Sequence, residues 1–135
     1  MQPTVGPGDK VTVNYFAYAV GKPKRWDVVA FEPPVFTNQI WLARVIALPG
    51  ESVSFASGGI AINSQPLALP AHITNIVYVS LDYPTFTEYK NRIASPLVVP
   101  KDCYFVLGDC STNSYDSRFW GGLPLTNILG RVRSK

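Results

Sequence analysis

The sequence predicts a mostly β fold, in which short strands build a folded sheet or a barrel. Helical periodicity is scarce in the 135 residues, whereas runs of apolar and β-branched residues recur along the chain. Between these runs lie 12 prolines and 10 glycines, the residues that most often mark turns. These observations favour a single β domain, residues 1–135, with a hydrophobic core of its own.

Several segments have the composition of β-strands. In chain order they are Lys10–Tyr15, Asp27–Phe31, Ile40–Leu48, Val53–Phe55, Gly59–Asn63, Ile76–Ser80 and Cys103–Leu107. Turn-forming residues lie before the first of these segments and between the first five, at 6–9, 21–23, 32–34, 49–51 and 57–59. Residues 64–96 are the least regular part, and we expect a lid, a hairpin or an excursion there. A separate domain is not expected, because this segment is too short to bury a core.

The composition excludes several functional classes. Hydrophobic residues make up 47% and charged residues 16%, which is typical of a globular protein. The net charge is only +3 and no basic block is present, so nucleic-acid binding is not expected. The final Arg131, Arg133 and Lys135 are interpreted as a solvated tail. No run of 18 apolar residues predicts a membrane span, and the first residues do not resemble a targeting peptide.

The cysteines and the histidine offer little chemistry. Cys103 and Cys110 are separated by a predicted strand, and if it is extended their Cα atoms lie about 20 Å apart. A disulfide needs less than about 7 Å, so two thiols are favoured over a bridge made by a sharp reversal. One histidine and two cysteines are too few for a zinc site, so neither a metal nor a cofactor is predicted. His72 has no motif around it and is interpreted as an ordinary loop residue.

The most unusual segment is Gly108–Gly121, which places short polar side chains directly after an apolar strand. Such side chains satisfy backbone groups in tight loops. From composition alone, the favoured interpretation is a surface loop with Asp116 and Arg118 as an exposed pair. The alternative is a loop whose hydroxyls and carboxylates orient a catalytic group.

Four segments, taken in order, resemble the conserved boxes of the type I signal peptidases. They are Met1-Gln-Pro-Thr with Gly8-Asp9, Arg25-Trp-Asp-Val-Val-Ala-Phe31, Ala43-Arg-Val-Ile-Ala-Leu-Pro-Gly-Glu51 and Gly108–Gly121. The sequence departs from the family pattern at Trp26, where the box has Gly, at Ala43, where it has Lys, and at Cys110, where it has Asn. The resemblance covers nearly the whole chain and is weakest between residues 60 and 95.

This resemblance implies a domain of the serine endopeptidases that remove signal peptides from exported proteins. The family uses a serine nucleophile and a lysine general base, which must be neutral to accept a proton. The serine would stand immediately before Met1, outside this chain, and the lysine position is Ala43. No catalytic residue is therefore intact, and the chain as given is expected not to cleave peptides.

The resemblance also implies a set of supporting residues and a substrate groove. By position, Ser114 matches the serine that bonds the lysine, and the charged residues match a buried framework in which Asp109 pairs with Arg44 and Asp116 with Arg118. The supporting residues are thus Ser114, Arg44, Asp109, Asp116 and Arg118, and the groove residues are Met1, Gln2 and Pro3. The implied partner is an extended signal peptide with small residues before its cleavage site. The implied location is the extracytoplasmic face of a membrane, with an anchor outside this chain.

Three accounts of this chain remain open, and two of them explain the missing catalytic pair. The chain could be a protease trimmed after its serine with Ala43 engineered, or a natural relative that lost catalysis and serves as a chaperone or assembly factor. The second account is favoured, because trimming after the serine already removes the nucleophile. An added substitution of the lysine would then be redundant. The third is a purely structural β domain. A retained groove requires Met1, Ala43 and Ser114 to converge on one shallow cleft.

Overall fold

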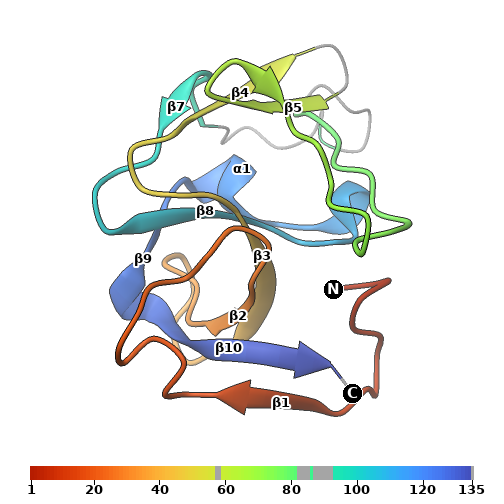
Figure 1. The fold of residues 1–135 in the computed structure, drawn as a ribbon, viewed down its shortest axis with the longest axis vertical. Coiled ribbons are helices and arrows are strands. Elements are labelled where there is room, and N and C mark those ends of the chain that lie inside the picture. The colour runs from red at the N-terminus through yellow and green to blue at the C-terminus, as the bar shows by residue number, and fades with distance from the viewer. Residues whose placement is uncertain (57–58, 82–85, 87–92, 135) are drawn as a thin grey trace.

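Two antiparallel sheets make up the fold (Figure 1). The computed structural model describes residues 1–56, 59–81, 86 and 93–134. The larger sheet has the strand order β1-β10-β2-β3-β8-β9, and the smaller has the order β6-β5-β4-β7. The prediction of a mostly β fold is confirmed, because the helical segments in the described part of the chain are only three or four residues long.

The strands of the larger sheet are β1 (Val11–Asn14), β2 (Val28–Phe31), β3 (Trp41–Ala47), β8 (Cys103–Leu107), β9 (Leu123–Pro124) and β10 (Ile128–Ser134). The smaller sheet consists of β4 (Ser52–Ala56), β5 (Gly59–Ile62), β6 (Gln65–Pro66) and β7 (Leu97–Val98). The described helical segments are η2 (Ser111–Asn113), α1 (Ser117–Trp120) and η3 (Leu125–Asn127). β1, β2, β3, β4, β5 and β8 lie where strands are predicted.

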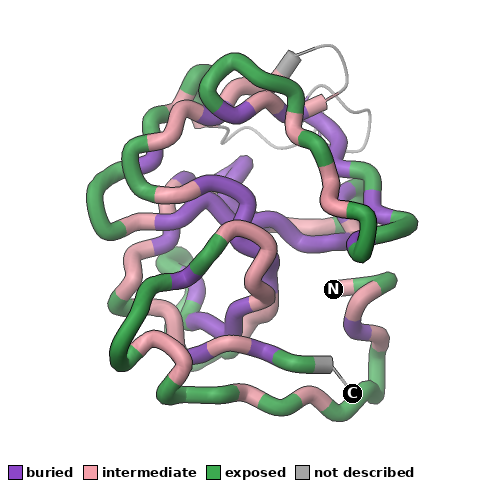
Figure 2. Tube along the Cα trace, viewed as in Figure 1, coloured by how far each residue is buried: buried purple, intermediate pink, exposed green. Residues whose placement is uncertain are grey.

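β3 connects two hydrophobic cores, because side chains of a strand alternate between the two faces of its sheet. Ala43 and Val45 pack in a cluster with buried residues of β2, β8 and β9. Ile46 belongs to a second cluster, which continues into β4 and β5 of the smaller sheet. Figure 2 shows β3 and β8 as largely buried, whereas the edge strand β1 is more exposed. The centre of β3 is thus held by packing on both faces.

The C-terminal residues form a strand, so the interpretation of Arg131 and Arg133 as a solvated tail is wrong. β10 lies between β1 and β2 in the larger sheet, and Val132 is buried opposite Val13. Apolar and charged residues alternate here with a period of two, which is the signal for a half-buried strand. Lys135 lies outside the described residues.

The predicted strand at 76–80 is also wrong, because these residues form no ladder with another strand. Their backbone groups bond to side chains instead. The Val79 N–H donates to Ser111 Oγ at 3.0 Å, and the Val79 carbonyl accepts from Arg118 Nη1 at 3.1 Å. Ile76, Tyr78 and Val79 are nevertheless buried. The apolar pattern thus correctly indicates burial, but the polar segment at 108–121 supplies the hydrogen bonds.

The described part of residues 64–96 is irregular after β6, as predicted, and residues 82–85 and 87–92 lie outside the described residues. It is an excursion that packs against the core, since Ile73 and Ile76 join the cluster around β4 and β8. Cys103 and Cys110 are free and partly buried, in agreement with the thiols that the sequence favours.

Candidate functional site

The N-terminal segment, β3 and the polar segment after β8 converge on one groove of about 600 Å³. This confirms the expected convergence of Met1, Ala43 and Ser114. The groove is lined by Met1, Gln2, Val5, Gly6 and Pro7, by Phe31, Trp41, Leu42 and Ala43, and by Cys110, Asn113, Ser114, Tyr115 and Asp116.

Ala43 lies on the wall of the groove that β3 contributes. It pairs with Val29 on β2, and only 2% of its surface is exposed. The position is therefore inside the packed sheet and its side chain is fixed in direction. A methyl group can accept no proton, so β3 offers no general base here.

One edge of β3 is open beside the groove. Trp41–Ala43 pair with β2 on one side, whereas pairing with β8 on the other side begins at Arg44. Within the described ranges, no strand pairs with this second edge of Trp41–Ala43. Unpaired backbone N–H and C=O groups on a sheet edge can bind an extended peptide as an added strand.

The N-terminal segment is held over the groove by Thr4. The Val5 N–H donates to the Met1 carbonyl at 3.0 Å, which closes a turn. The Thr4 hydroxyl donates to Asp109 and accepts from Arg44 Nη2 at 2.9 Å. This turn leaves Met1 at the groove but places Pro3 at a different pocket. Met1 and Gln2 line the groove, Pro3 lines the second pocket, and the role of all three as substrate-groove residues stays a prediction.

Asp109 is the centre of a buried polar network. Arg44 donates to it from Nε at 2.9 Å and from Nη2, and the Tyr78 hydroxyl donates at 2.7 Å. With Thr4, four donors reach its two oxygens, which matches the number of acceptor sites on a carboxylate. The predicted pair between Arg44 and Asp109 is thus present, while the contributions of Thr4 and Tyr78 carried no sequence signal.

The pKa values in this network follow from burial and from the Asp109 charge. Burial raises the pKa of Tyr78 well above its ordinary value, and the adjacent carboxylate of Asp109 raises it further. Burial lowers the pKa of Arg44, but the hydrogen bonds and charge of Asp109 outweigh this, so the net shift is upward. Tyr78 therefore stays protonated and Arg44 stays charged at neutral pH.

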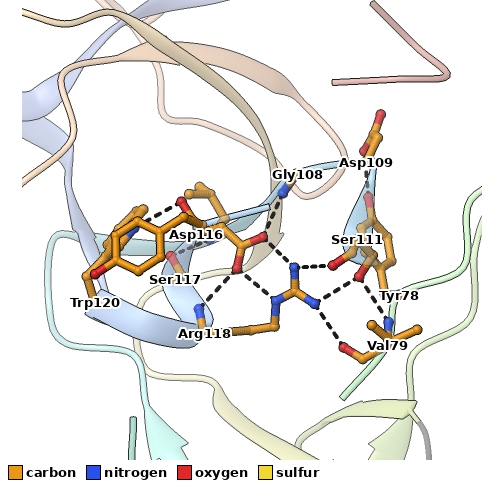
Figure 3. A network of polar contacts seen from close by, with 11 residues as sticks. Tyr78, Val79, Gly108, Asp109, Ser111, Asp116, Ser117, Arg118 and Trp120 are labelled. Carbon is orange, nitrogen blue, oxygen red and sulfur yellow. Dashed lines mark hydrogen bonds and ion pairs between the residues drawn. The ribbon is translucent and has the colours of Figure 1, made fainter. Parts of the chain in front are cut away.

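Arg118 makes a second buried framework, shown in Figure 3. Its Nε and Nη2 donate to the two oxygens of Asp116 at 2.8 and 2.7 Å. Its Nη1 donates to Ser111 Oγ and to the Val79 carbonyl, and Nη2 also donates to the Ser111 carbonyl. All five guanidinium donors are thus used. The ring of Phe86 lies 4.7 Å from the Arg118 Cζ, which adds a cation–π contact.

The burial of this pair overturns the interpretation of residues 108–121 as a surface loop with an exposed ion pair. The side chain of Arg118 is 0% exposed and that of Asp116 is 3% exposed. Asp116 also accepts from the Gly108 N–H at 3.1 Å and from the Arg118 N–H, which caps α1. The polar segment is therefore fastened to the end of β8 and to residues 78–81.

Ser114 presents a hydroxyl to the groove. Its Oγ would lie 2.2 Å from a Cβ built on Gly108, so the close contact requires glycine at 108. Among the described residues, the Ser114 hydroxyl makes no hydrogen bond. Ser114 and Ala43 line the same groove.

An aromatic wall at the groove carried no sequence signal. The rings of Phe36 and Trp41 are 5.4 Å apart, and those of Phe36 and Tyr115 are 6.3 Å apart. Tyr115 in turn stacks on Phe119 at 5.1 Å. Phe36 lies in the turn after β2, and nothing in the sequence pairs this turn with residue 115.

Other candidate chemistry is sparse. His72 is exposed and lines the pocket at Pro3, not the groove. Cys110 lines the groove but its side chain does not cap η2. Across the described ranges, no group of three His, Cys, Asp or Glu side chains could hold a metal ion.

The chain is similar to signal peptidases over its whole length. The profile of the family described as "Signal peptidase, peptidase S26" matches residues 1–135. A "Signal peptidase I" from Leptolyngbya laminosa is 36% identical over 139 residues, which cover 98% of this chain and 62% of that protein. "Thylakoidal processing peptidase 1, chloroplastic" from Arabidopsis thaliana is 30% identical over 141 residues, which cover 97% of this chain and 37% of that protein.

A solved structure has the same fold. The crystal structure of a signal peptidase I from Enterococcus faecalis V583 superposes with a TM-score of 0.59 at 32% sequence identity. The match covers 82% of this chain and 96% of that one.

The chain spans about half the length of several curated relatives, from 62% of the Leptolyngbya protein to 34% of another Arabidopsis processing peptidase. Among the helices of the described residues, none has the length and apolar character needed to cross a bilayer. The family match over residues 1–135 and the shared fold lead to one conclusion: this chain belongs to the signal peptidase I family, peptidase S26.

Proposed function

We propose that this chain is a peptide-binding domain of the protein-export pathway that holds signal-peptide-like segments without cleaving them. It resembles enzymes in fold and groove, but lacks the base that their chemistry needs. The observation that carries the proposal is Ala43, buried on β3 and facing the same groove as Ser114.

Inactivity follows from the chemistry of peptide cleavage. A serine hydroxyl attacks a carbonyl only when a base removes its proton. Ala43 stands where the family box has its lysine, and a serine placed before Met1 would still lack a base. Among the residues that the structure describes, no lysine lines the groove. The domain therefore retains a site for the peptide but not for the reaction.

The groove fits an extended peptide with small side chains. The open edge of β3 at Trp41–Ala43 offers backbone hydrogen bonds. Met1, Val5 and Ala43 supply an apolar surface beside it. By family membership, the natural ligand would be the segment before the cleavage site of an exported protein, and the domain would act outside the cytoplasm next to a membrane. A chaperone or assembly role for exported proteins follows from binding without cleavage.

The test compares binding with cleavage. A labelled peptide containing Ala-x-Ala should bind the purified chain, measured by fluorescence anisotropy, and remain intact by mass spectrometry. Asn113→Trp places a large side chain in the groove from an exposed position, and should weaken binding at least about tenfold. Thr126→Trp, also exposed but outside the groove, is the matched control and should bind as the parent does.

Restoring the catalytic pair separates the alternatives. A serine inserted before Met1 together with Ala43→Lys should give measurable cleavage, and either change alone should not. Cleavage by the unmodified chain would disprove the proposed inactivity. Equal, negligible binding by the parent and Asn113→Trp would favour a purely structural domain.

A further inference from the structure

The second pocket, of about 620 Å³, is lined mainly by polar and charged residues. Its walls include residues 3–5, residues 72–76 of the excursion and residues 131–133 of β10. In Figure 1 the N-terminal segment lies between the excursion and the C-terminal end of β10. Eight of the 15 lining residues are polar or charged, so the pocket is suited to a polar ligand.

The wall that the excursion contributes carries hydrogen-bond donors on an anchored backbone. Ile73 and Ile76 are buried and belong to the hydrophobic cluster around β4 and β8. His72, Thr74 and Asn75 are exposed and line the pocket. An imidazole, a hydroxyl and an amide can each donate a hydrogen bond. The two isoleucines thus fix a segment that offers three polar side chains to a ligand.

The wall that β10 contributes carries two arginines. Arg131 and Arg133 are two residues apart on one strand, so their side chains project from the same face of the sheet. Arg131 lies 3.8 Å from Asp27, whose carboxylate also accepts from the Tyr18 hydroxyl at 3.0 Å. Arg133 is exposed, and within the described part of the chain it makes no ion pair. Asp27 therefore balances at most one of the two guanidinium groups.

The remaining cation at the pocket, Arg44, adds no net charge. It donates to Asp109 from Nε at 2.9 Å and from Nη2, so the two charges cancel. Arg131 and Arg133 set against Asp27 leave one positive charge in excess among the lining residues. A pocket with excess positive charge and donors on more than one wall favours an anion.

We infer that the second pocket binds a phosphate group, with Arg131 and Arg133 on one wall and the donors of residues 72–76 on another. A carboxylate is planar and one guanidinium can match both of its oxygens. A phosphate group has more oxygens, which accept from donors that approach from several directions. The site lies outside the peptide groove and does not depend on the proposed function. Free phosphate and a phospholipid headgroup present the same chemistry, and the experiment separates them.

The first test uses inorganic phosphate as the probe. It is titrated into the isotope-labelled chain at constant ionic strength, and backbone amide shifts are followed by NMR. Shifts should concentrate at residues 72–76 and 131–133, with a Kd on the order of 1 mM, and acetate should bind at least about tenfold more weakly. Absence of phosphate binding, shifts located elsewhere, or equal binding of acetate would overturn the inference.

Two variants separate the pocket from the overall charge of the protein. Arg133→Gln removes the guanidinium that has no described ion pair, and should weaken phosphate binding at least about tenfold. Lys101→Gln is the matched control, because it removes the same charge from an exposed position outside the pocket, and it should bind phosphate as the parent does. Thermal unfolding should be unchanged in both. Equal weakening by the two variants would reduce the effect to net charge and refute the site.

Vesicles identify the source of the phosphate group. Flotation compares vesicles of phosphatidylcholine alone with vesicles that also contain phosphatidic acid, whose headgroup is a terminal phosphate. Binding to the second kind that Arg133→Gln loses would assign the site to a lipid headgroup. Phosphate binding without vesicle binding, or vesicle binding that Arg133→Gln keeps, would assign the pocket to a free phosphate.

Discussion

The two sides of the groove are built very differently. On the side of the polar segment, Arg118 uses all five of its donors and Asp109 accepts four hydrogen bonds. On the side of β3, Ala43 offers a methyl group. Between them, the hydroxyl of Ser114 makes no hydrogen bond within the described part of the chain. One side is completely satisfied, whereas Ala43 on the other side offers no polar group.

This difference distinguishes residues that hold the fold together from residues that catalysis needs. Arg44, Asp109, Asp116 and Arg118 join β3, the end of β8 and the excursion, so losing any of them would leave a buried charge without its partner. Their presence therefore indicates a shared fold and does not indicate activity. A lysine at 43 would not be needed to hold the fold together, because Ala43 packs well at this position. Residue 43 is thus the better indicator of chemistry.

The largest effect should come from breaking the satisfied side. Arg118→Met leaves the Asp116 carboxylate buried beside an apolar side chain, and should lower the free energy of unfolding by about 3–5 kcal/mol. Arg131→Met is the control, because its pair with Asp27 is long and partly exposed, and it should cost at most about 1 kcal/mol. Urea denaturation measures both. Similar losses in the two variants would mean that the buried network contributes no more than a surface pair.

A smaller loss is expected from Tyr78→Phe, which removes one donor from Asp109. Breaking a hydrogen bond to a charged group should cost about 1.5–3 kcal/mol at neutral pH. The pKa of Tyr78 is raised above its ordinary 10.0 by burial and by Asp109, so the folded state holds this proton more tightly than the unfolded state. Stability from this group is complete below pH 10.0 and is lost as pH rises further.

Thermal unfolding between about pH 8 and pH 11 checks this linkage. The parent should lose stability above pH 10.0 more steeply than Tyr78→Phe, because the variant lacks one of the shifted groups. Parallel curves for the two proteins would show that Tyr78 does not carry the alkaline loss.

The sequence was most informative where regular patterns coincide with short motifs. The strands around Asp27–Phe31, Ile40–Leu48 and Cys103–Leu107 carry runs of apolar residues, and the motifs beside them correctly predicted the pairs of Arg44 with Asp109 and of Asp116 with Arg118. These pairs could be inferred because an unpartnered charge next to an apolar strand is costly.

The sequence was least informative where side chains replace backbone pairing. The run at Ile76–Ser80 has the composition of a strand, but its polar groups bond to Ser111 and Arg118, more than 30 residues away. No local pattern encodes such a bond. Arg131 and Arg133 were wrongly interpreted as a solvated tail because they are charged. The buried Val132 between them marks a strand.

The incomplete side of the groove can be probed with Ala43→Lys. The new side chain enters a packed position, and should lower stability by about 1–3 kcal/mol near pH 6. Burial disfavours the ammonium and lowers the lysine pKa below its ordinary value of about 10.4, so the unfolded state binds the proton more tightly. Stability should therefore recover as pH rises from about 6 to 9. Ala43→Met has similar bulk and no charge, and should show no such recovery; identical pH profiles would place the lysine amine in solvent.

The smallest effect, and the most specific one, concerns Ser114. In the parent the Ser114 hydroxyl makes no hydrogen bond to the residues that the structure describes. Ser114→Ala should therefore change the free energy of unfolding by less than about 0.5 kcal/mol. In the Ala43→Lys background the hydroxyl faces an amine, and the same substitution should cost about 0.5–1.5 kcal/mol more. A double-mutant cycle measures this coupling between 43 and 114. A zero coupling would mean that the two positions share a groove without contact, and that restoring a base at 43 does not restore its partner. A positive coupling would show that the Ser114 hydroxyl is positioned to bond an amine at residue 43.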